Sequence, residues 1–242
     1  MLRFVSAVEM LVVDAPWSRP LTASSAPEES LSGYTAGSIF TNLVTEPMRD
    51  KYVNFAELSS SEPDGAFRIE VRRKESAVAL IAPHGGKIEP GTSEICRSVA
   101  GEDLTYYLFE GCKSNKNRNL HITSSRFDEP QGIDVARSAQ VVVAFHGQNA
   151  SELFVNVGGL ATRVCASVIC HLQTAGFKAS QHDDPNLQGR DKNNICNRGS
   201  KGQGLQLEIS RGLRDVLTSD KSAMSRFSSA IRSALDEVEQ FT

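Results

Sequence analysis

Four residues of this sequence have side chains and positions suited to metal-dependent hydrolysis. His84 and His146 each directly follow a short apolar run, and Glu89 comes five residues after His84. Two imidazoles and one carboxylate around an open fourth position form a ligand set of catalytic zinc. Glu208 lies in a later alternating segment and supplies a second carboxylate. Together the four residues fit one mechanism, that of a metallohydrolase.

Two apolar segments must position the histidines. Residues 76–83 (SAVALIAP) and 139–145 (AQVVVAF) are short and uniformly apolar, which is typical of strands covered on both faces. In open α/β sheets, ligand sites lie in the crevice beyond the carboxyl ends of the strands. His84 and His146 therefore face one crevice if their strands are close in the sheet.

The turn after residue 83 lets Glu89 reach the same point as His84. Gly85 and Gly86 permit a tight turn with positive φ, and Gly147 does the same after His146. Taken singly, each residue also has an ordinary interpretation. A histidine after a strand is often a hydrogen-bonded loop residue, and a loop glutamate is usually solvated.

The segment 204–210 (GLQLEIS) alternates strictly between apolar and polar residues. Leu205, Leu207 and Ile209 share one face of the predicted strand, so Glu208 points to the other. A carboxylate placed there must meet solvent, pair with a cation or line a site.

Helical periodicity appears in three further segments. We expect one helix from Thr92 to about Leu108, opened by a Gly-Thr cap, and a second over 159–174. A third, over 219–241, has apolar residues at spacings of three and four. The predicted fold is a single α/β domain with a mixed, mostly parallel sheet flanked by helices.

Composition and charge limit the function classes. The chain has 242 residues, 40% hydrophobic and 23% charged, as in an ordinary globular enzyme. Its net charge is only −3, so we expect no nucleic-acid partner and no membrane partner. Residues 15–50 are rich in Ser, Pro, Thr and Gly. We therefore expect an irregular extension over 1–50 and a hydrolase domain over 51–242.

The N-terminal segment and the cysteines bear on the compartment. Glu9 and Asp14 interrupt the apolar start, which argues against a signal peptide, and no stretch is long enough to span a bilayer. The five cysteines form no recognisable disulfide or metal pattern and are expected to be reduced and mostly buried. We expect a cytoplasmic, monomeric protein.

A basic stretch precedes and follows Glu208. It contains six cations against Asp191 and Glu208, namely Arg190, Lys192, Arg198, Lys201, Arg211 and Arg214. Arginine is suited to forked recognition of carboxylates, so this stretch indicates an anionic substrate. Arg198 is the preferred clamp, with Asn197 and Arg211 beside it; a solvated basic loop is the alternative.

The other histidines and the cysteines are weaker candidates. His121 is expected to be structural, although a role behind the ligands stays open, and His171 falls on the polar flank of a helix. His182 lies in a polar loop with two aspartates, where a solvated loop is favoured over a metal site. A cysteine nucleophile is disfavoured because no cysteine neighbours a strand-end histidine in sequence.

At these motifs the sequence resembles the poly-γ-glutamate hydrolase family of bacteriophages and phage-derived bacterial genes. The resemblance spans roughly residues 51–217, and its long first and last motifs are specific. The matching stretches are YVNFAEL (52–58), APHGGKIEPGTSEI (82–95), LHITSSRFDEP (120–130), VVVAFHGQ (141–148) and NNICNRGSKGQGLQLEISRGLR (193–214).

The resemblance implies a zinc carboxypeptidase-like core with one zinc ion per chain. Carried over to this sequence, it implies His84, Glu89 and His146 as ligands and Glu208 as general base. The spacing of His84 and Glu89 departs from the H-x-x-E of carboxypeptidases, and the Asn197-Arg198 pair follows the second zinc histidine instead of preceding it. Exopeptidase specificity is therefore not expected.

The implied activity is endo-cleavage of γ-linked polyglutamate, a polymer with a free carboxylate on every residue. That charge agrees with the basic stretch around Glu208. Two alternatives stay open from the sequence: hydrolysis of another amide, such as a peptidoglycan peptide or an N-acyl amino acid, and a non-catalytic phage-derived binding protein.

Overall fold

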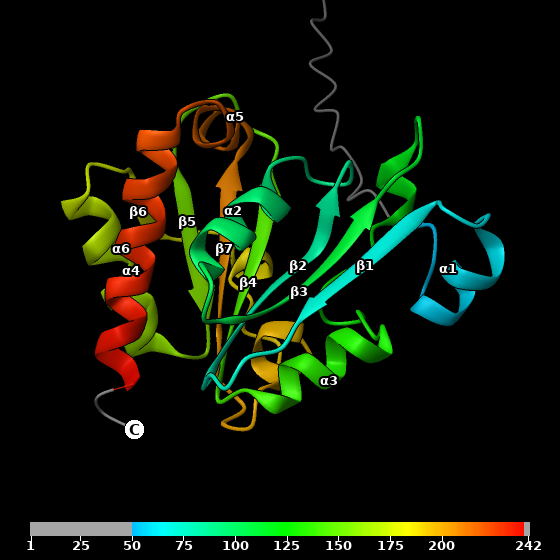
Figure 1. The fold of residues 1–242 in the computed structure, drawn as a ribbon, viewed down its shortest axis with the longest axis horizontal. Coiled ribbons are helices and arrows are strands. Elements are labelled where there is room, and N and C mark those ends of the chain that lie inside the picture. Colours follow the sequence, from blue (N-terminus) through cyan, green and yellow to red (C-terminus); the bar gives the residue numbers. More distant parts are fainter. Residues whose placement is uncertain (1–49, 240–242) are drawn as a thin grey trace, which may run out of the picture. The chain divides into compact units, whose positions relative to one another are not determined.

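A mixed sheet of seven strands forms the centre of the described part of the chain, in the order β1-β3-β2-β4-β7-β5-β6 (Figure 1). The computed structural model describes residues 50–239, so the expected extension lies outside the described residues except for Asp50. The strands are β1 (Phe67–Arg72), β2 (Val78–Gly86), β3 (Thr105–Gly111), β4 (Val141–Gln148), β5 (Val155–Gly159), β6 (Ala179–Gln181) and β7 (Leu205–Ser210).

The four central strands, β3, β2, β4 and β7, are parallel to one another. Strands β1 and β5 run antiparallel to their central neighbours. The carboxyl ends of the central strands therefore meet at one edge of the sheet, on the side where α5 lies (Figure 1). The predicted mixed, mostly parallel α/β fold is confirmed.

Helices cover both faces of the sheet (Figure 1). One face carries α2 (Thr92–Ala100), α4 (Thr162–Thr174), α5 (Arg211–Ser219) and α6 (Lys221–Glu239). The other carries α1 (Phe55–Ser61), α3 (Pro130–Ser138) and the 3-10 turn η3 (Ile195–Arg198). Two more 3-10 turns, η1 (Asn117–Leu120) and η2 (Pro185–Leu187), lie in loops.

Residue alternation decides which side chains enter each layer. Leu205, Leu207 and Ile209 of β7 join the apolar cluster beneath α4 and α6. Gln206 and Glu208 point to the opposite face, as the alternation predicts. In β4, the same period places Phe145 in the first cluster and turns His146 towards the side of Glu208.

The helix expected from Thr92 to about Leu108 is shorter than predicted. It ends at Ala100, because Gly101 has φ +51 and turns the chain out of the helix. Residues 105–111 then form β3, all of whose side chains are buried. The aromatic pair Tyr106-Tyr107 favours a strand, and burial on both faces outweighs the helical spacing.

The other two helices follow their predicted stripes. Helix α4 begins at Thr162 and buries Val164, Val168 and Leu172. The C-terminal helix begins at Lys221 and is preceded by the separate helix α5, because Asp220 leaves helical geometry. Of the helices between residues 50 and 239, none combines the length and apolar character needed to cross a bilayer.

The cysteines are all free thiols, but fewer are buried than expected. Cys96 and Cys196 are buried, whereas Cys112 and Cys170 are exposed. Burial raises the pKa of Cys165 to about 11. Burial also raises the pKa of Cys96 and Cys196, which disfavours the thiolate form of these three cysteines.

An ion-pair network seats α2 on the edge of the sheet. Arg97 of α2 donates to Glu70 of β1 at 2.6 Å and to Glu110 of β3 at 2.9 Å. Tyr106 also donates to Glu70, at 2.5 Å. Because α2 begins directly after the loop that carries Glu89, this network holds the helix that follows that loop.

We predict that Glu70→Gln lowers stability in a pH-dependent way. The Arg97 guanidinium lowers the pKa of Glu70 to about 2, so its stabilising contribution is present above about pH 4.5 and lost as the pH falls towards 2. The expected cost is about 1 kcal/mol at pH 7, after allowance for partial solvent exposure. Denaturant unfolding at pH 7 and pH 3.5 measures it, with the exposed Glu102→Gln as control; an equal loss at both pH values would contradict it.

Candidate functional site

A cleft of about 790 Å³ lies at the carboxyl ends of the central strands. Its lining includes His84, Glu89, His146 and Glu208, so the structure brings together all four residues that the sequence selects for chemistry. His84 lies near the end of β2, and His146 lies near the end of β4. Glu89 follows the turn after β2, and Glu208 lies on β7.

The donor atoms of three residues lie close together, and a different oxygen of Glu89 faces each imidazole. Nδ1 of His84 lies 3.2 Å from Nδ1 of His146 and 3.4 Å from Oε1 of Glu89. Nδ1 of His146 lies 3.9 Å from Oε2 of Glu89. Bonds of about 2.1 Å in tetrahedral geometry separate two ligand atoms by about 3.4 Å. The spacing therefore suits a single metal ion.

The turn between His84 and Glu89 brings the carboxylate back to the histidines. The backbone N–H of Glu89 donates to the carbonyl of His84 at 2.9 Å, closing the turn. Gly86 adopts φ +61 there, and a side chain at this position would strike the backbone of Gly111. Oε2 of Glu89 accepts from the backbone N–H of Gly147 at 2.7 Å, which ties the end of β2 to the end of β4.

Outer contacts orient both imidazoles. Nε2 of His84 donates to the carbonyl oxygen of Ile122 at 2.8 Å. Because a carbonyl only accepts, a neutral His84 presents a lone pair at Nδ1. Nε2 of His146 lies 3.2 Å from the hydroxyl of Ser124, which allows the same arrangement. Both residues are thus held through their far nitrogens, as metal-binding histidines usually are.

Electrostatics favour the ligand forms of Glu89 and His146. Burial works to raise the pKa of Glu89, but the imidazoles of His84 and His146 lower it to about 2. Burial and the neighbouring His84 lower the pKa of His146 to about 3. An ionised carboxylate and a neutral imidazole are the forms that bind a metal.

Glu208 lies opposite His146 on the adjacent strand. The two residues are register partners of β4 and β7, and Gln206 donates to Oε1 of Glu208 at 3.1 Å. Burial and the charge of Glu89 raise the pKa of Glu208 to about 8, against the opposing effect of Arg214 and Arg118. A carboxyl group that titrates near neutrality can both take and return a proton.

Asp50 and His121 also belong to the site; the sequence interpretation missed Asp50 and left a role of His121 behind the ligands open. The His121 ring stacks on His84 with centroids 3.9 Å apart, and its Nε2 lies 3.9 Å from Oε1 of Glu89. His84, Glu89 and His121 also form a cluster able to hold a metal. Nδ1 of His121 is held by Asp50 at 2.6 Å. The structural role expected for His121 is therefore too narrow, because its ring lines the cleft.

Asp50 anchors the whole segment behind the two imidazoles. Its buried carboxylate also accepts from the backbone and hydroxyl of Thr123 and from Arg126, each at 2.7 Å. This residue lies in the stretch assigned to the extension, yet it is bound to the folded unit. The available sequence signal was the polar stretch HITSSR (121–126), whose several hydrogen-bond donors need an acceptor elsewhere in the fold.

Arg214 connects three segments of the site. Its buried guanidinium donates to the carbonyls of Pro90, Gln148 and Ile209. These residues follow Glu89, His146 and Glu208 closely in the chain. A side chain at Gly147 would approach the guanidinium carbon within 2.6 Å and would displace the Arg214 side chain.

The expected substrate residues fall into two groups. Arg211 lines the cleft and bonds to Asp215 at 2.7 Å. Arg198 and Asn197 are not among the lining residues, contrary to the expected clamp. Arg198 donates to three carbonyls, of Phe127, Ser125 and Asn193, and the amide of Asn197 bonds to four backbone groups. These bonds support loops, so direct substrate contact by the pair stays a prediction.

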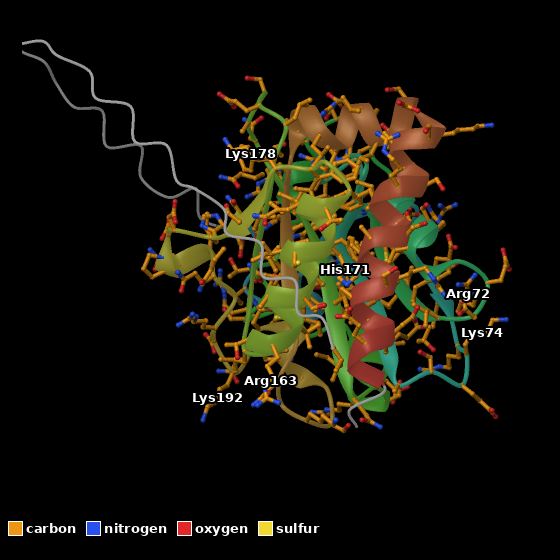
Figure 2. The ribbon with its side chains drawn as sticks, turned by 90° about the vertical axis from the view of Figure 1, so that its left-hand side faces the viewer. Arg72, Lys74, Arg163, His171, Lys178 and Lys192 are labelled. Atoms are coloured by element: carbon orange, nitrogen blue, oxygen red, sulfur yellow. The ribbon has the colours of Figure 1, made fainter. Side chains whose placement is uncertain are left out.

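The two remaining histidines lie apart from the metal cluster. His171 bonds to Glu237 at 2.9 Å, joining α4 to α6 (Figure 2). His182 is buried, contrary to the expected solvated position, and accepts from the backbone N–H of Asp184 at 3.1 Å.

Comparison with known proteins agrees with the geometry of the cleft. The family model described as poly-gamma-glutamate hydrolase matches residues 52–241. YndL of Bacillus subtilis (strain 168) is 37% identical over 190 residues, covering 78% of this chain and 75% of YndL. The SPbeta prophage-derived YoqZ of the same bacterium is 39% identical over 162 residues, or 66% of this chain. The chain spans only 59% of the length of YoqZ.

Two solved structures share the fold. A bacteriophage poly-gamma-glutamate hydrolase superposes with a TM-score of 0.76 and 31% identity, covering 80% of this chain and 100% of the phage protein. A zinc-free structure of YndL superposes with a TM-score of 0.74 and 34% identity, covering 78% and 98%.

We predict that Asp50→Ala weakens metal binding although Asp50 contacts none of the expected ligands His84, Glu89 and His146. Loss of the carboxylate frees the segment that orients His84 and His146, and changes of this kind usually lower metal affinity about 10- to 100-fold. Competition with a chromogenic chelator for zinc measures the effect. Asp128→Ala, whose carboxylate accepts from Phe55 instead, is the matched control. Wild-type affinity in Asp50→Ala would show that the segment is held without it.

Proposed function

Because the chain belongs to the poly-γ-glutamate hydrolase family, we propose that it cleaves γ-glutamyl amide bonds within polyglutamate with the help of one zinc ion. Family membership makes it a hydrolase. The zinc ligands would be His84, Glu89 and His146, and Glu208 would be the general base.

The convergence of three ligand atoms carries this proposal. The Nδ1 atoms of His84 and His146 face each other at 3.2 Å inside a buried site, with Oε1 of Glu89 at 3.4 Å. Two neutral imidazoles held through Nε2 would direct two lone pairs at one point, and a cation there removes their repulsion. Two nitrogens and one oxygen donor suit zinc and leave a position for chemistry.

Glu208 supplies the proton transfers of the reaction. Zinc, when bound, would polarise the amide carbonyl and make water more acidic. Glu208 would accept the proton of the attacking water and return it to the leaving nitrogen. Its position on β7, level with His146 on β4, places the carboxylate beside the ligand cluster.

The surroundings favour an anionic polymer cleaved internally. Four arginines line the cleft, namely Arg118, Arg190, Arg211 and Arg214. Arg211 lies directly after β7 and would contact the substrate close to Glu208. The Asn197 amide bonds to four backbone groups and Arg198 donates to three backbone carbonyls, which disfavours use of the pair as a clamp for a chain terminus and supports endo-cleavage.

We predict about one zinc per purified chain and zinc-dependent shortening of poly-γ-glutamate. Endo-cleavage lowers the mean polymer mass before free glutamate appears, so size-exclusion chromatography and amino-acid analysis of the same samples distinguish it from exo-cleavage. A chelator should stop the reaction and added zinc should restore it. Zinc binding without cleavage would move the search to peptidoglycan peptides and N-acyl amino acids. Absence of zinc, even after reconstitution, would refute the metal site.

We predict that Glu208→Gln lowers kcat about 10²- to 10⁴-fold, the usual contribution of general base catalysis, while zinc content stays unchanged. The amide keeps the shape of the side chain but cannot take the proton. The exposed Glu75→Gln, in the loop before β2, is the matched control. Near-normal turnover by Glu208→Gln would remove this residue from the mechanism.

A further inference from the structure

We propose that Arg118 forms a carboxylate-binding subsite on the side of the metal cluster opposite Arg211. This subsite rests on the proposed function, because an anionic polymer carries a carboxylate on each side of the bond that is cleaved. It is carried by three features of Arg118, namely its unused hydrogen-bond donors, its fixed backbone and its position across the cleft.

The guanidinium of Arg118 has unused donors. Within residues 50–239 its side chain makes no hydrogen bond, and its ion pair is with Oε1 of Glu89 at 3.5 Å, longer than a hydrogen bond. Glu89 has its own partners in Gly147 and the imidazoles. The side chain of Arg118 is 47% exposed and lines the cleft. By contrast, the Arg214 guanidinium donates to three backbone carbonyls.

The backbone beneath Arg118 is firmly held. Asn117 is buried, and its side-chain amide bonds to the N–H and the carbonyl of Lys113 at 2.9 and 2.8 Å. The Asn117 side chain packs closely on Gly111, where an added side chain would come within 2.8 Å of Oδ1 of Asn117. Leu120, at the end of η1, is buried in the core. The arginine is therefore presented from a rigid turn, which lowers the entropic cost of binding.

Sheet order places Arg118 and Arg211 on opposite flanks of the cluster. Arg118 follows β3, and Arg211 follows β7. Strands β2 and β4, which carry His84 and His146, lie between them in the order β3-β2-β4-β7. Because these four strands are parallel, all of these residues meet at one edge. A chain that crosses the cleft along this edge passes one cation before the metal cluster and another after it.

A forked guanidinium with free donors recognises a carboxylate better than it recognises a neutral amide. We assign Arg118 the carboxylate of a glutamyl residue bound beyond β2, on the β3 side of the scissile bond. Arg118 would act in binding and registration, with no proton transfer. Its loss should weaken substrate binding and leave zinc binding in place.

Binding by the inactive, zinc-loaded Glu208→Gln protein tests the subsite without turnover. The ligand is a γ-linked glutamyl hexamer, and isothermal titration calorimetry measures its Kd. Adding Arg118→Gln should raise Kd about 10- to 100-fold, the usual effect of losing a charge-assisted hydrogen bond. Arg118→Lys should recover part of the loss. Arg163→Gln is the charge-matched control, exposed at the start of α4 and away from α5 (Figure 2).

A hexamer whose α-carboxylates are converted to carboxamides identifies the group that Arg118 recognises. Its Kd should be insensitive to Arg118→Gln; an equal loss with this neutral ligand would assign the arginine to the amide chain and overturn the carboxylate subsite. An unchanged Kd for the charged hexamer, or no hexamer binding by the Glu208→Gln parent, would also overturn it.

The wild-type cleavage assay distinguishes failure of the subsite from failure of the proposed function. If the wild type cleaves the polymer but adding Arg118→Gln leaves the hexamer Kd unchanged, only the subsite is refuted. If the wild type does not cleave the polymer but the hexamer Kd depends on Arg118, the proposed reaction is refuted and the subsite is supported.

Discussion

Two buried imidazoles face each other through their Nδ1 atoms at 3.2 Å, and much of the surrounding structure serves that contact. A carbonyl oxygen holds Nε2 of His84, so a neutral ring must direct its lone pair inward. Glu89 adds a negative charge to the same point. The cluster thus gathers two nitrogen donors and a carboxylate, groups that suit a cation, and hydrogen bonds to Ile122, Ser124 and Gly147 hold them in place.

The supports come from the loops around the sheet edge. The segment from His121 to Ser124 contacts both imidazoles from behind, and the buried carboxylate of Asp50 holds that segment. Arg214 holds the loops after Glu89, His146 and Glu208 from the other direction. Asp50 and Arg214 thus act on different sides of one cluster, and neither lies on a strand that carries a ligand.

The arginines of this region show how one side-chain type serves two purposes. Arg198 and Arg214 direct their donors to backbone carbonyls and stabilise irregular segments that the sheet cannot hold. Arg118 and Arg211 line the cleft; within residues 50–239 the side chain of Arg118 makes no hydrogen bond, and that of Arg211 bonds to Asp215. Arg118 and Arg211 therefore retain more donors for an anionic ligand than Arg198 and Arg214, although all four look alike in the sequence.

Short-range sequence patterns by themselves determined the central strands β2, β4 and β7 and the meeting of the four candidate residues. The apolar runs before His84 and His146, the two-residue period around Glu208 and the glycines after His84 predicted that these four candidate residues would share one crevice, and all four line one cleft. These features are local, because a strand repeats every two residues and a parallel sheet brings its carboxyl ends together. The same local rules failed at β3, where the tertiary burial of residues 105–111 outweighed a helical spacing.

Only the tertiary structure decided the roles of Asp50, His121 and the individual arginines. The contact of Asp50 with His121 spans 71 positions, and that of Arg214 with Pro90 spans 124. Hydrogen bonds between distant loops follow no period in the chain, since their partners are set by how the loops meet over the sheet. The sequence shows that a side chain carries a charge, but only the tertiary structure shows which group that side chain contacts.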